Sequence, residues 1–218
     1  MKNRLIIAIS LFLLLTTITT QKKLLLSNFH LTNISIENNF FLKDEEITET
    51  LSSIYSKNLI FLSNREIQNV LSKNDLIDSF KIRKIYPDTL KITIIEKKPI
   101  AILQTKKEKF FLSEKIEIIA FRELKNFLDL PYIYGDEKNF KILYENLEKI
   151  KFPISIIKNF TFFGSNRWDL VINNKQTIKL PSKNYTKNLE NYLELRKRKN
   201  FEKYKIFDYR IGGQLILK

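Results

Sequence analysis

The clearest alternation of apolar and polar positions lies between residues 80 and 101. Two runs with the period of two that is typical of strands flank a break at 86–89. The break contains Pro87, whose fixed φ suits a turn, and Asp88, which can hydrogen-bond nearby backbone. The stretch therefore predicts a β-hairpin, and Pro99 marks a strand end or an edge. The apolar positions of the two runs are Phe80 and Ile82, then Leu90, Ile92 and Ile94.

One strand and two helices are predicted before this hairpin. Apolar residues over 31–36 predict a strand, followed by a turn at 37–39 whose asparagines tolerate positive φ. Asp44 is expected to cap a helix, because apolar residues recur behind it at helical spacing. Ser63 and Glu66 form the S-x-x-E pattern of a capping box that opens a second helix. The order strand, helix, helix, strand, strand favours a three-stranded sheet with two helices on one face.

The remainder of the chain predicts a larger region that is mainly antiparallel β with packed helices. Asp136 is expected to cap a helix whose apolar stripe recurs at helical spacing up to Ile150. The basic residues that end a later predicted helix suit the negative end of its dipole. The fold class is therefore α+β. The expected strands are 100–104, 110–112, 116–120, 154–163, 168–172, 177–180 and 214–217, and the later helix is 185–199.

An apolar run close to the amino terminus predicts contact with a membrane. Lys2 and Arg4 precede the run, and its length from Leu5 to Thr20 is just below that of a spanning helix. We interpret residues 5–23 as an uncleaved transmembrane signal anchor, because no pair of small residues follows the run; a cleaved signal peptide is the alternative. The predicted domains are a cytoplasmic tail at 1–4, the anchor at 5–23, a first domain at 29–101 and a β domain at 102–218.

Composition narrows the chemistry that the chain can perform. It has no cysteine and one histidine, so disulfides, zinc clusters and histidine-based catalysis lack their parts. No phosphate-binding loop or nucleophile motif is present, and we expect neither an enzyme nor a cofactor, metal or small-molecule substrate. The net charge of +14 is spread along the whole chain. That distribution favours a general attraction to anionic surfaces over nucleic-acid binding.

Four motifs in order give the chain a resemblance to a known family. Together they resemble the FtsQ/DivIB family of bacterial cell-division proteins. The motifs are the hairpin, the Leu-Pro-x-Ile-x-Gly string at 130–135, the strings at 167–181 and the Asp-x-Arg string at 208–210. The first domain then resembles a POTRA domain. The hairpin residues that carry the likeness are Lys84, Pro87, Leu90, Ile92, Ile94, Glu96, Pro99 and Ala101.

The resemblance implies a function and a location. It implies a non-enzymatic divisome scaffold that recruits and positions division proteins at the septum, with small bitopic partners similar to FtsB and FtsL. It also implies a single-pass type II protein of the cytoplasmic, or inner, membrane whose carboxy-terminal domains are periplasmic. A POTRA-bearing accessory protein of envelope assembly or protein transport is the alternative function.

The candidate partner-binding residues lie in the last strand and beside it. If that strand is at a sheet edge, its unpaired backbone groups form a template for a partner strand. Two arginines would then hold an acidic residue of the partner. The competing interpretation is that this strand only closes the sheet and that Arg167 forms an ordinary salt bridge. The candidate residues are Arg167, Arg210, Ile211, Gly212, Gly213, Gln214, Leu215, Ile216 and Leu217.

Overall fold

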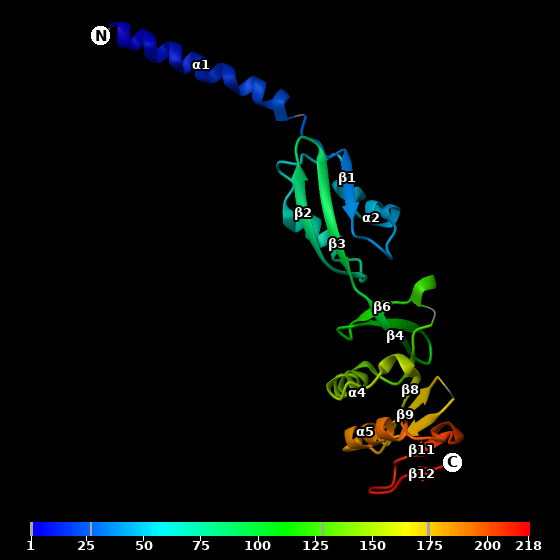
Figure 1. The fold of residues 1–218 in the computed structure, drawn as a ribbon. Coiled ribbons are helices and arrows are strands. Elements are labelled where there is room, and N and C mark those ends of the chain that lie inside the picture. The colour runs from blue at the N-terminus through cyan, green and yellow to red at the C-terminus, as the bar shows by residue number, and fades with distance from the viewer. Residues whose placement is uncertain (1, 27, 128, 174) are drawn as a thin grey trace. The chain divides into compact units, whose positions relative to one another are not determined.

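A computed structural model describes residues 2–26, 28–127, 129–173 and 175–218, and the chain divides into two compact units (Figure 1). The first unit comprises residues 1–97 and the second comprises residues 98–218.

The amino-terminal apolar run is helical. Helix α1 spans Lys2–Leu26, and its apolar side chains between Leu5 and Leu15 are exposed. The anchor predicted at 5–23 falls on this helix, but the side chains of its residues 17–23 lie outside the described ones. Within the described part of the chain, none of the helices has both the length and the apolar character needed to cross a membrane.

The rest of the first unit has the predicted order strand, helix, helix, strand, strand. β3 lies at the centre of a three-stranded sheet, pairing parallel with β1 and antiparallel with β2. Ile92 is fully buried on the face covered by the helices, while Lys91 points to the other face and pairs with Glu37 at 2.7 Å. The elements are β1 (Asn33–Glu37), α2 (Asp44–Thr50), the 3-10 turn η1 (Ser52–Ile54), α3 (Asn64–Leu71), β2 (Ile77–Ile85) and β3 (Thr89–Glu96).

Local signals predicted the helix starts of this unit with one error. The capping box of Ser63 and Glu66 is present at α3, and Asn38 takes the positive φ expected of the turn. The prediction that Asp44 caps α2 is wrong, because Lys43 is the N-cap and Asp44 is the first helical residue. The Asp44 carboxylate instead accepts a hydrogen bond from the Asn39 amide at 2.5 Å. A contact with the preceding loop therefore engages the Asp44 side chain in place of the cap.

Glu96, at the end of β3, joins two distant parts of the first unit. Its carboxylate accepts hydrogen bonds from the backbone N–H groups of Phe40, Phe41 and Leu42 at 2.7–3.1 Å. Three backbone donors on one carboxylate hold the loop before α2 against the end of the hairpin. We call this contact the Glu96 clamp.

The second unit is built on a nine-stranded sheet in the order β12-β11-β10-β9-β8-β7-β4-β5-β6. β4 begins at Pro99, so residues 99–101, which were predicted to end the first domain, pair with β5 instead. The elements are β4 (Pro99–Gln104), β5 (Lys109–Ser113), β6 (Ile118–Ala120), η2 (Lys125–Phe127), β7 (Tyr132–Tyr134), α4 (Glu137–Lys149), η3 (Ile154–Ile156), β8 (Ile157–Phe163), β9 (Arg167–Ile172), β10 (Thr177–Lys179), α5 (Tyr185–Leu195), η4 (Phe201–Lys203), β11 (Ile206–Asp208) and β12 (Ile216–Leu217).

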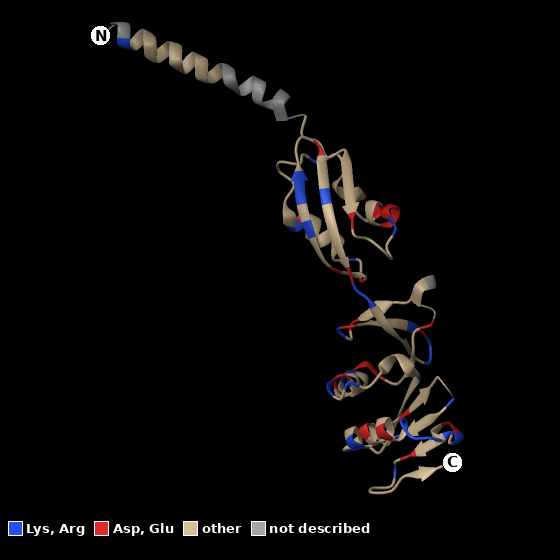
Figure 2. Ribbon diagram, viewed as in Figure 1, with Lys and Arg blue, Asp and Glu red and all other residues tan. Residues whose placement is uncertain are grey.

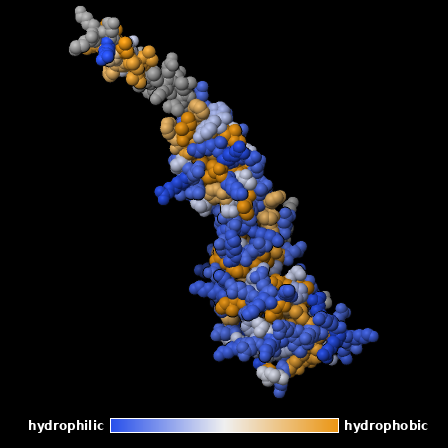
Figure 3. Space-filling model, turned by 60° about the vertical axis from the view of Figure 1, so that its left-hand side comes forward, coloured by the Kyte–Doolittle hydropathy of each residue, from blue (hydrophilic) through white to orange (hydrophobic). Residues whose placement is uncertain are grey.

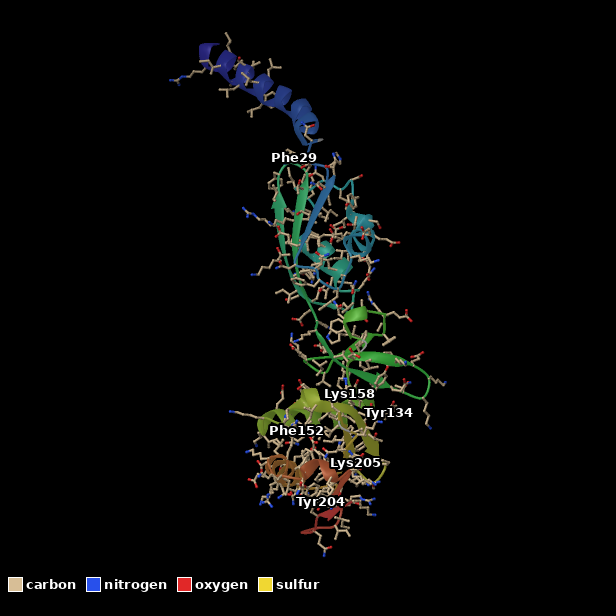
Figure 4. The ribbon with its side chains drawn as sticks, turned by 45° about the vertical axis from the view of Figure 1, so that its right-hand side comes forward. Phe29, Tyr134, Phe152, Lys158, Tyr204 and Lys205 are labelled. Atoms are coloured by element: carbon tan, nitrogen blue, oxygen red, sulfur yellow. The ribbon has the colours of Figure 1, made fainter. Side chains whose placement is uncertain are left out.

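Helices α4 and α5 cover one face of this sheet and form its main core. Phe140 of α4 meets Phe160 of β8 edge to face, with ring centroids 5.1 Å apart, and Tyr192 of α5 meets Phe207 of β11 in the same way at 5.0 Å. Asp136 caps α4 as predicted, accepting from Asn139 N–H at 3.0 Å. Side chains from these two helices and from the strands between them fill this face of the unit (Figure 4).

Five predicted elements of the second unit are shorter than expected, namely β6, β8, β10, α5 and β12, and two of them show the physical reason. Helix α5 ends at Leu195, so the basic residues 196–199 form turns beyond it and not its last turn. β6 begins at Ile118, because Ile116 takes a positive φ of 58° and the Ser113 hydroxyl accepts hydrogen bonds from the following turn. Both ends were set by loop geometry that apolar periodicity does not report.

Candidate functional site

The last described strand lies at one edge of the nine-stranded sheet, which is the condition that the partner-strand hypothesis requires, and it spans Ile216–Leu217 in place of the expected 214–217. β12 pairs antiparallel with β11, with Leu217 opposite Phe207 and Ile216 opposite Asp208, and no further strand of the described residues follows it. The chain reaches it through a turn in which Gly213 takes a φ of +71°, a conformation that glycine adopts without strain.

The hydrogen bonds of this strand show which backbone groups face outward. Ile206 and Lys218 exchange both bonds, at 3.0 Å and 3.1 Å. Because backbone groups alternate along an antiparallel strand, Ile216 also points toward β11, while the N–H and C=O of Leu217 point away from the sheet. The same alternation applies to side chains, since Leu215 and Leu217 pack against the core and Ile216 is exposed.

Arg210, which follows β11, is held by a fork of charged hydrogen bonds. Its Nε donates to Asp208 Oδ1 at 2.8 Å, and its Nη2 donates to Asp208 Oδ2 at 2.6 Å. The fork holds the pKa of the Asp208 carboxyl below its usual value, although partial burial opposes this. Nη1 takes no part in the fork, so the guanidinium is oriented and can still donate.

Arg167, at the start of β9, is oriented by different neighbours. Its guanidinium lies 4.3 Å from the centroid of the Phe163 ring, and its Nε donates to Ser165 Oγ at 3.1 Å. Its Nη1 lies 3.6 Å from Asp169 Oδ1, within ion-pair range but without a hydrogen bond. Both atoms are buried, and neither has a hydrogen-bond partner among the described residues.

The structure brings the two predicted arginines to the same side of the sheet. Asp169 of β9 lies opposite Lys179 of β10, which lies opposite Asp208 of β11. Burial raises the pKa of the Asp169 carboxyl, and the nearby charges of Arg167, Lys179 and Arg210 oppose that rise. We call Arg167, Asp169, Lys179, Asp208 and Arg210 the charged row; it lies on the face of the sheet that the helices leave open.

Sequence reasoning missed Asp169 and Lys179. Residues two apart share a face of a strand, so the spacing of Arg167 and Asp169 was a usable signal. The part played by Lys179 depends on the register between β9, β10 and β11, which no local pattern reports.

A cavity beside the last strand was also missed. It has a volume of about 330 Å³ and lies on the opposite face of the sheet from the charged row, because its wall includes the core-facing side chains of β11 and β12. Its floor is apolar and basic side chains lie at its rim. It is lined by Leu195, Arg198, Lys199, Asn200, Phe201, Tyr204, Phe207 and Leu217.

The described residues offer no arrangement suited to a metal ion. Nowhere among them do three or more histidine, cysteine, aspartate or glutamate side chains converge as ligands would. The candidate site therefore consists of a free strand edge, a charged row and an apolar cavity, which are features of a protein-binding surface.

Comparison with known proteins gives consistent matches over both units. Residues 29–97 match the family described as "POTRA domain, FtsQ-type", and residues 101–210 match "Cell division protein FtsQ/DivIB, C-terminal". Cell division protein FtsQ of Rickettsia conorii is 28% identical over 186 residues, which cover 84% of this chain and 69% of that protein. FtsQ of Rickettsia bellii is 29% identical over 164 residues, covering 74% and 61%, and FtsQ of Bartonella bacilliformis is 23% identical over 170 residues, covering 77% and 55%.

Proposed function

Because the chain belongs to the FtsQ/DivIB family of cell division proteins, we propose that it is a non-enzymatic scaffold that holds other division proteins at the septum. The observation that carries the proposal is the free edge of β12 in the second unit, next to the charged row. A scaffold needs a surface that another chain can recognise, and a free strand edge supplies backbone hydrogen bonds for this purpose.

The proposed partner adds a strand to β12. Its backbone pairs with the outward N–H and C=O of Leu217, and alternate side chains of the added strand lie on the two faces of the sheet. On one face they meet the cavity beside Leu217, whose floor is apolar. On the other face they meet Arg210 and the charged row, where Nη1 of the exposed Arg210 is available to an acidic residue, while Arg167, whose Nη1 is buried, only contributes positive charge to the row. The partner segment is therefore extended and carries both apolar and acidic residues.

Family membership directs the choice of partner and location. We propose that the partner is a small bitopic division protein similar to FtsB or FtsL. We also propose that residues 5–23 tether the scaffold to the cytoplasmic membrane as a single-pass type II protein, with both units in the periplasm. The support for the tether is the apolar run at 5–20 and the exposure of its apolar side chains between Leu5 and Leu15.

Two variants at one position test strand addition. Leu217→Pro removes the outward N–H that a partner strand would bind, whereas Leu217→Ala loses a similar side chain but keeps that N–H. With a co-expressed FtsB-like protein of the same organism, we expect Leu217→Pro to weaken co-purification by about tenfold or more relative to Leu217→Ala, since one strong hydrogen bond is worth about 1.4 kcal/mol. Equal binding by the two variants, with equal melting temperatures, would rule out backbone pairing at this strand.

A charge reversal tests the row on the open face. Arg210→Glu should weaken binding, while Lys187→Glu, which makes the same change on the exposed side of α5, should leave it unchanged. Melting temperatures of both variants show whether the turn near Asp208 has been damaged. Normal binding by folded Arg210→Glu protein would remove the charged row from the proposal.

The location has a separate test. Because the chain has no cysteine, a Lys158→Cys variant carries a single thiol on an exposed position of the second unit (Figure 4). A membrane-impermeant maleimide should label it in cells with a permeabilised outer membrane and an intact inner membrane. Labelling only after the inner membrane is lysed would place this unit in the cytoplasm and contradict the proposed orientation.

A further inference from the structure

Three segments of the first unit meet at one end of its sheet. Leu59 N–H donates to the carbonyl of Phe29 at 2.6 Å, and the ring of Phe29 packs edge to face on Tyr86, with centroids 5.9 Å apart. Lys84 donates from Nζ to the carbonyl of Leu62. Residue 29, the loop 59–62 and the turn 85–88 therefore form one surface, which we call the entry end because the chain enters the unit there. Figure 4 labels Phe29 at this end.

The entry end carries most of the exposed large apolar side chains of the unit. Six such side chains are exposed between residues 28 and 97, and four of them lie here. The exposed fractions are 39% for Ile60, 70% for Phe61, 43% for Ile85 and 54% for Tyr86. The hydrophobic surface in this part of the first unit is visible in Figure 3. A group of exposed apolar side chains marks a surface that contacts a partner or a membrane.

Charge differs between the two ends of the same unit. Exposed or half-exposed Lys57, Arg65, Arg83 and Lys84 lie at the entry end or beside it, where Lys57 pairs with Glu66 at 2.8 Å. Acidic residues gather at the opposite end, on α2 and at the Glu96 clamp, although Lys43 is exposed there too and Asp88 lies in the turn of the entry end. Figure 2 shows the basic residues along β2 and β3 and the acidic residues on α2. The entry end is therefore the one that an anionic surface would attract.

The length of the connecting chain limits how far this end can lie from the apolar run. The two residues 27 and 28 separate the end of α1 from Phe29, which allows a reach of about 10 Å at 3.3–3.6 Å per residue. The eight residues of β3 extend about 26 Å from the entry end toward the opposite end of the unit. If α1 is in a bilayer, the entry end therefore lies within reach of the headgroups, whereas the opposite end reaches them only if the unit lies on its side.

We propose that the entry end of the POTRA unit rests on the lipid–water interface beside the anchor, as a second membrane contact. Aromatic and aliphatic side chains of the loop 59–62 and of Ile85 and Tyr86 seat among the headgroups, as aromatic residues do at membrane interfaces, and Arg83 and Lys84 face anionic phosphates. The inference rests on the membrane tether of the proposed function. It adds that the POTRA unit is held at the surface and does not move freely on its tether.

Single thiols on the full chain can test this contact, because the chain has no cysteine of its own. An Asn64→Cys variant places a fluorophore next to the loop 59–62, and a Lys43→Cys variant places it at the acidic end; both positions are exposed. An Ile9→Cys variant places it in the apolar run. Each protein is reconstituted into vesicles of phosphatidylcholine and phosphatidylglycerol in equal parts, with a quencher attached to the lipid headgroup or acyl chain.

We expect headgroup lipids to quench the label at 64 about twofold or more above the label at 43, given the strand length between the ends. Phe61→Ser with Tyr86→Ser should abolish that difference, whereas Phe40→Ser, at the other end, should preserve it. Vesicles of phosphatidylcholine alone should show a smaller difference.

The outcomes separate the two proposals. Suppose that acyl-chain lipids quench the label at 9 but that the labels at 64 and 43 are quenched equally. The proposed second contact is then wrong, the tether stands, and the exposed apolar side chains of the entry end remain as a surface for a protein partner. If the label at 9 is not quenched, the tether itself is wrong.

Discussion

The two units use aromatic residues in opposite ways. Every buried apolar side chain that the structure describes in the first unit is leucine or isoleucine, while Phe40, Phe61 and Tyr86 of that unit are exposed. In the second unit, the core between the sheet and its helices contains phenylalanine, tyrosine and tryptophan, including Trp168 and Tyr192. Aliphatic side chains suffice to fill the core between a three-stranded sheet and two short helices. The comparison teaches that aromatic residues of the first unit are available for contact, whereas those of the second supply its stability.

The largest expected effect is a charge in the aliphatic core. Ile92 is fully buried at the centre of the three-stranded sheet, so Ile92→Asp would bury an unpaired carboxylate and cost more than about 4 kcal/mol. Lys91→Asp, on the other face, loses its pair with Glu37 and should cost about 1 kcal/mol or less. Hydrogen exchange of peptides from the first unit measures the loss of stability in both variants. Equal loss of protection in the two variants would mean that the assigned faces of β3 are wrong.

The aromatic difference itself is tested by matched truncations. Phe160 is fully buried between α4 and the sheet, so Phe160→Ala should cost about 3–5 kcal/mol in the second unit. Phe61→Ala removes the same side chain from the surface of the first unit and should change its stability by less than about 0.5 kcal/mol. Unit-resolved hydrogen exchange again supplies the measurement. A large loss from Phe61→Ala would show that this ring packs within the fold and is not held ready for contact.

Alkaline stability should differ between the units. Burial raises the pKa of Tyr192 to about 12, and it also raises the pKa of Tyr209. The folded state keeps these protons when the unfolded state, with a pKa near 10, has released them, so stability falls as pH rises from 10 toward 12 by about 2 kcal/mol for Tyr192. Unfolding of the second unit followed from pH 9 to 11.5 measures the loss. Tyr192→Phe should flatten the curve, although it also removes the hydrogen bond to Gln176 at 3.1 Å.

The smallest effect is expected at the charged row. The fork from Arg210 lowers the pKa of Asp208, so its stabilisation is complete above the ordinary carboxyl pKa near 4 and is lost as pH falls through the lower folded value. Asp208→Asn should therefore lower the melting temperature of the second unit slightly at pH 7 and not at pH 2. Asp169→Asn is the contrasting variant, because the raised pKa of Asp169 means that its charge opposes folding at neutral pH. If Asp169→Asn lowers the melting temperature at pH 7 more than Asp208→Asn does, the charge of Asp169 stabilises the fold and the assignment of the two carboxylates is wrong.

Much of the fold was predictable where the signal was local. The capping box at Ser63, the cap at Asp136 and the alternation of the hairpin each lie within a few residues of the element that they define. The errors lie where a side chain had a second local partner, as when Asn39 bound the carboxylate of Asp44 five residues away, or where a positive φ in a loop delayed a strand, as at Ile116. The edge position of β12, in contrast, depends on the strand order of the whole sheet, which no local pattern reports.

The candidate site was predicted less completely. Its two arginines came from the family resemblance, while Asp169 and Lys179 join the row only through the register of three strands. One of these pairings, between β10 and β11, is parallel and spans helix α5. Such a pairing is not encoded in neighbouring residues, so neither the row nor the cavity beside Leu217 could be derived from sequence spacing.

The Glu96 clamp has a consequence for the order in which the first unit folds. It joins Glu96 to backbone 54–56 residues earlier in the chain, and β1 pairs with β3 over the same separation. Closing a loop of that length costs entropy before any contact is gained, while the hairpin of β2 and β3 closes through a short turn. The hairpin can therefore form early and serve as the template onto which β1 docks. We therefore expect the clamp to form late in folding and to slow mainly the detachment of β1, so that Glu96→Gln should speed unfolding more than it slows folding.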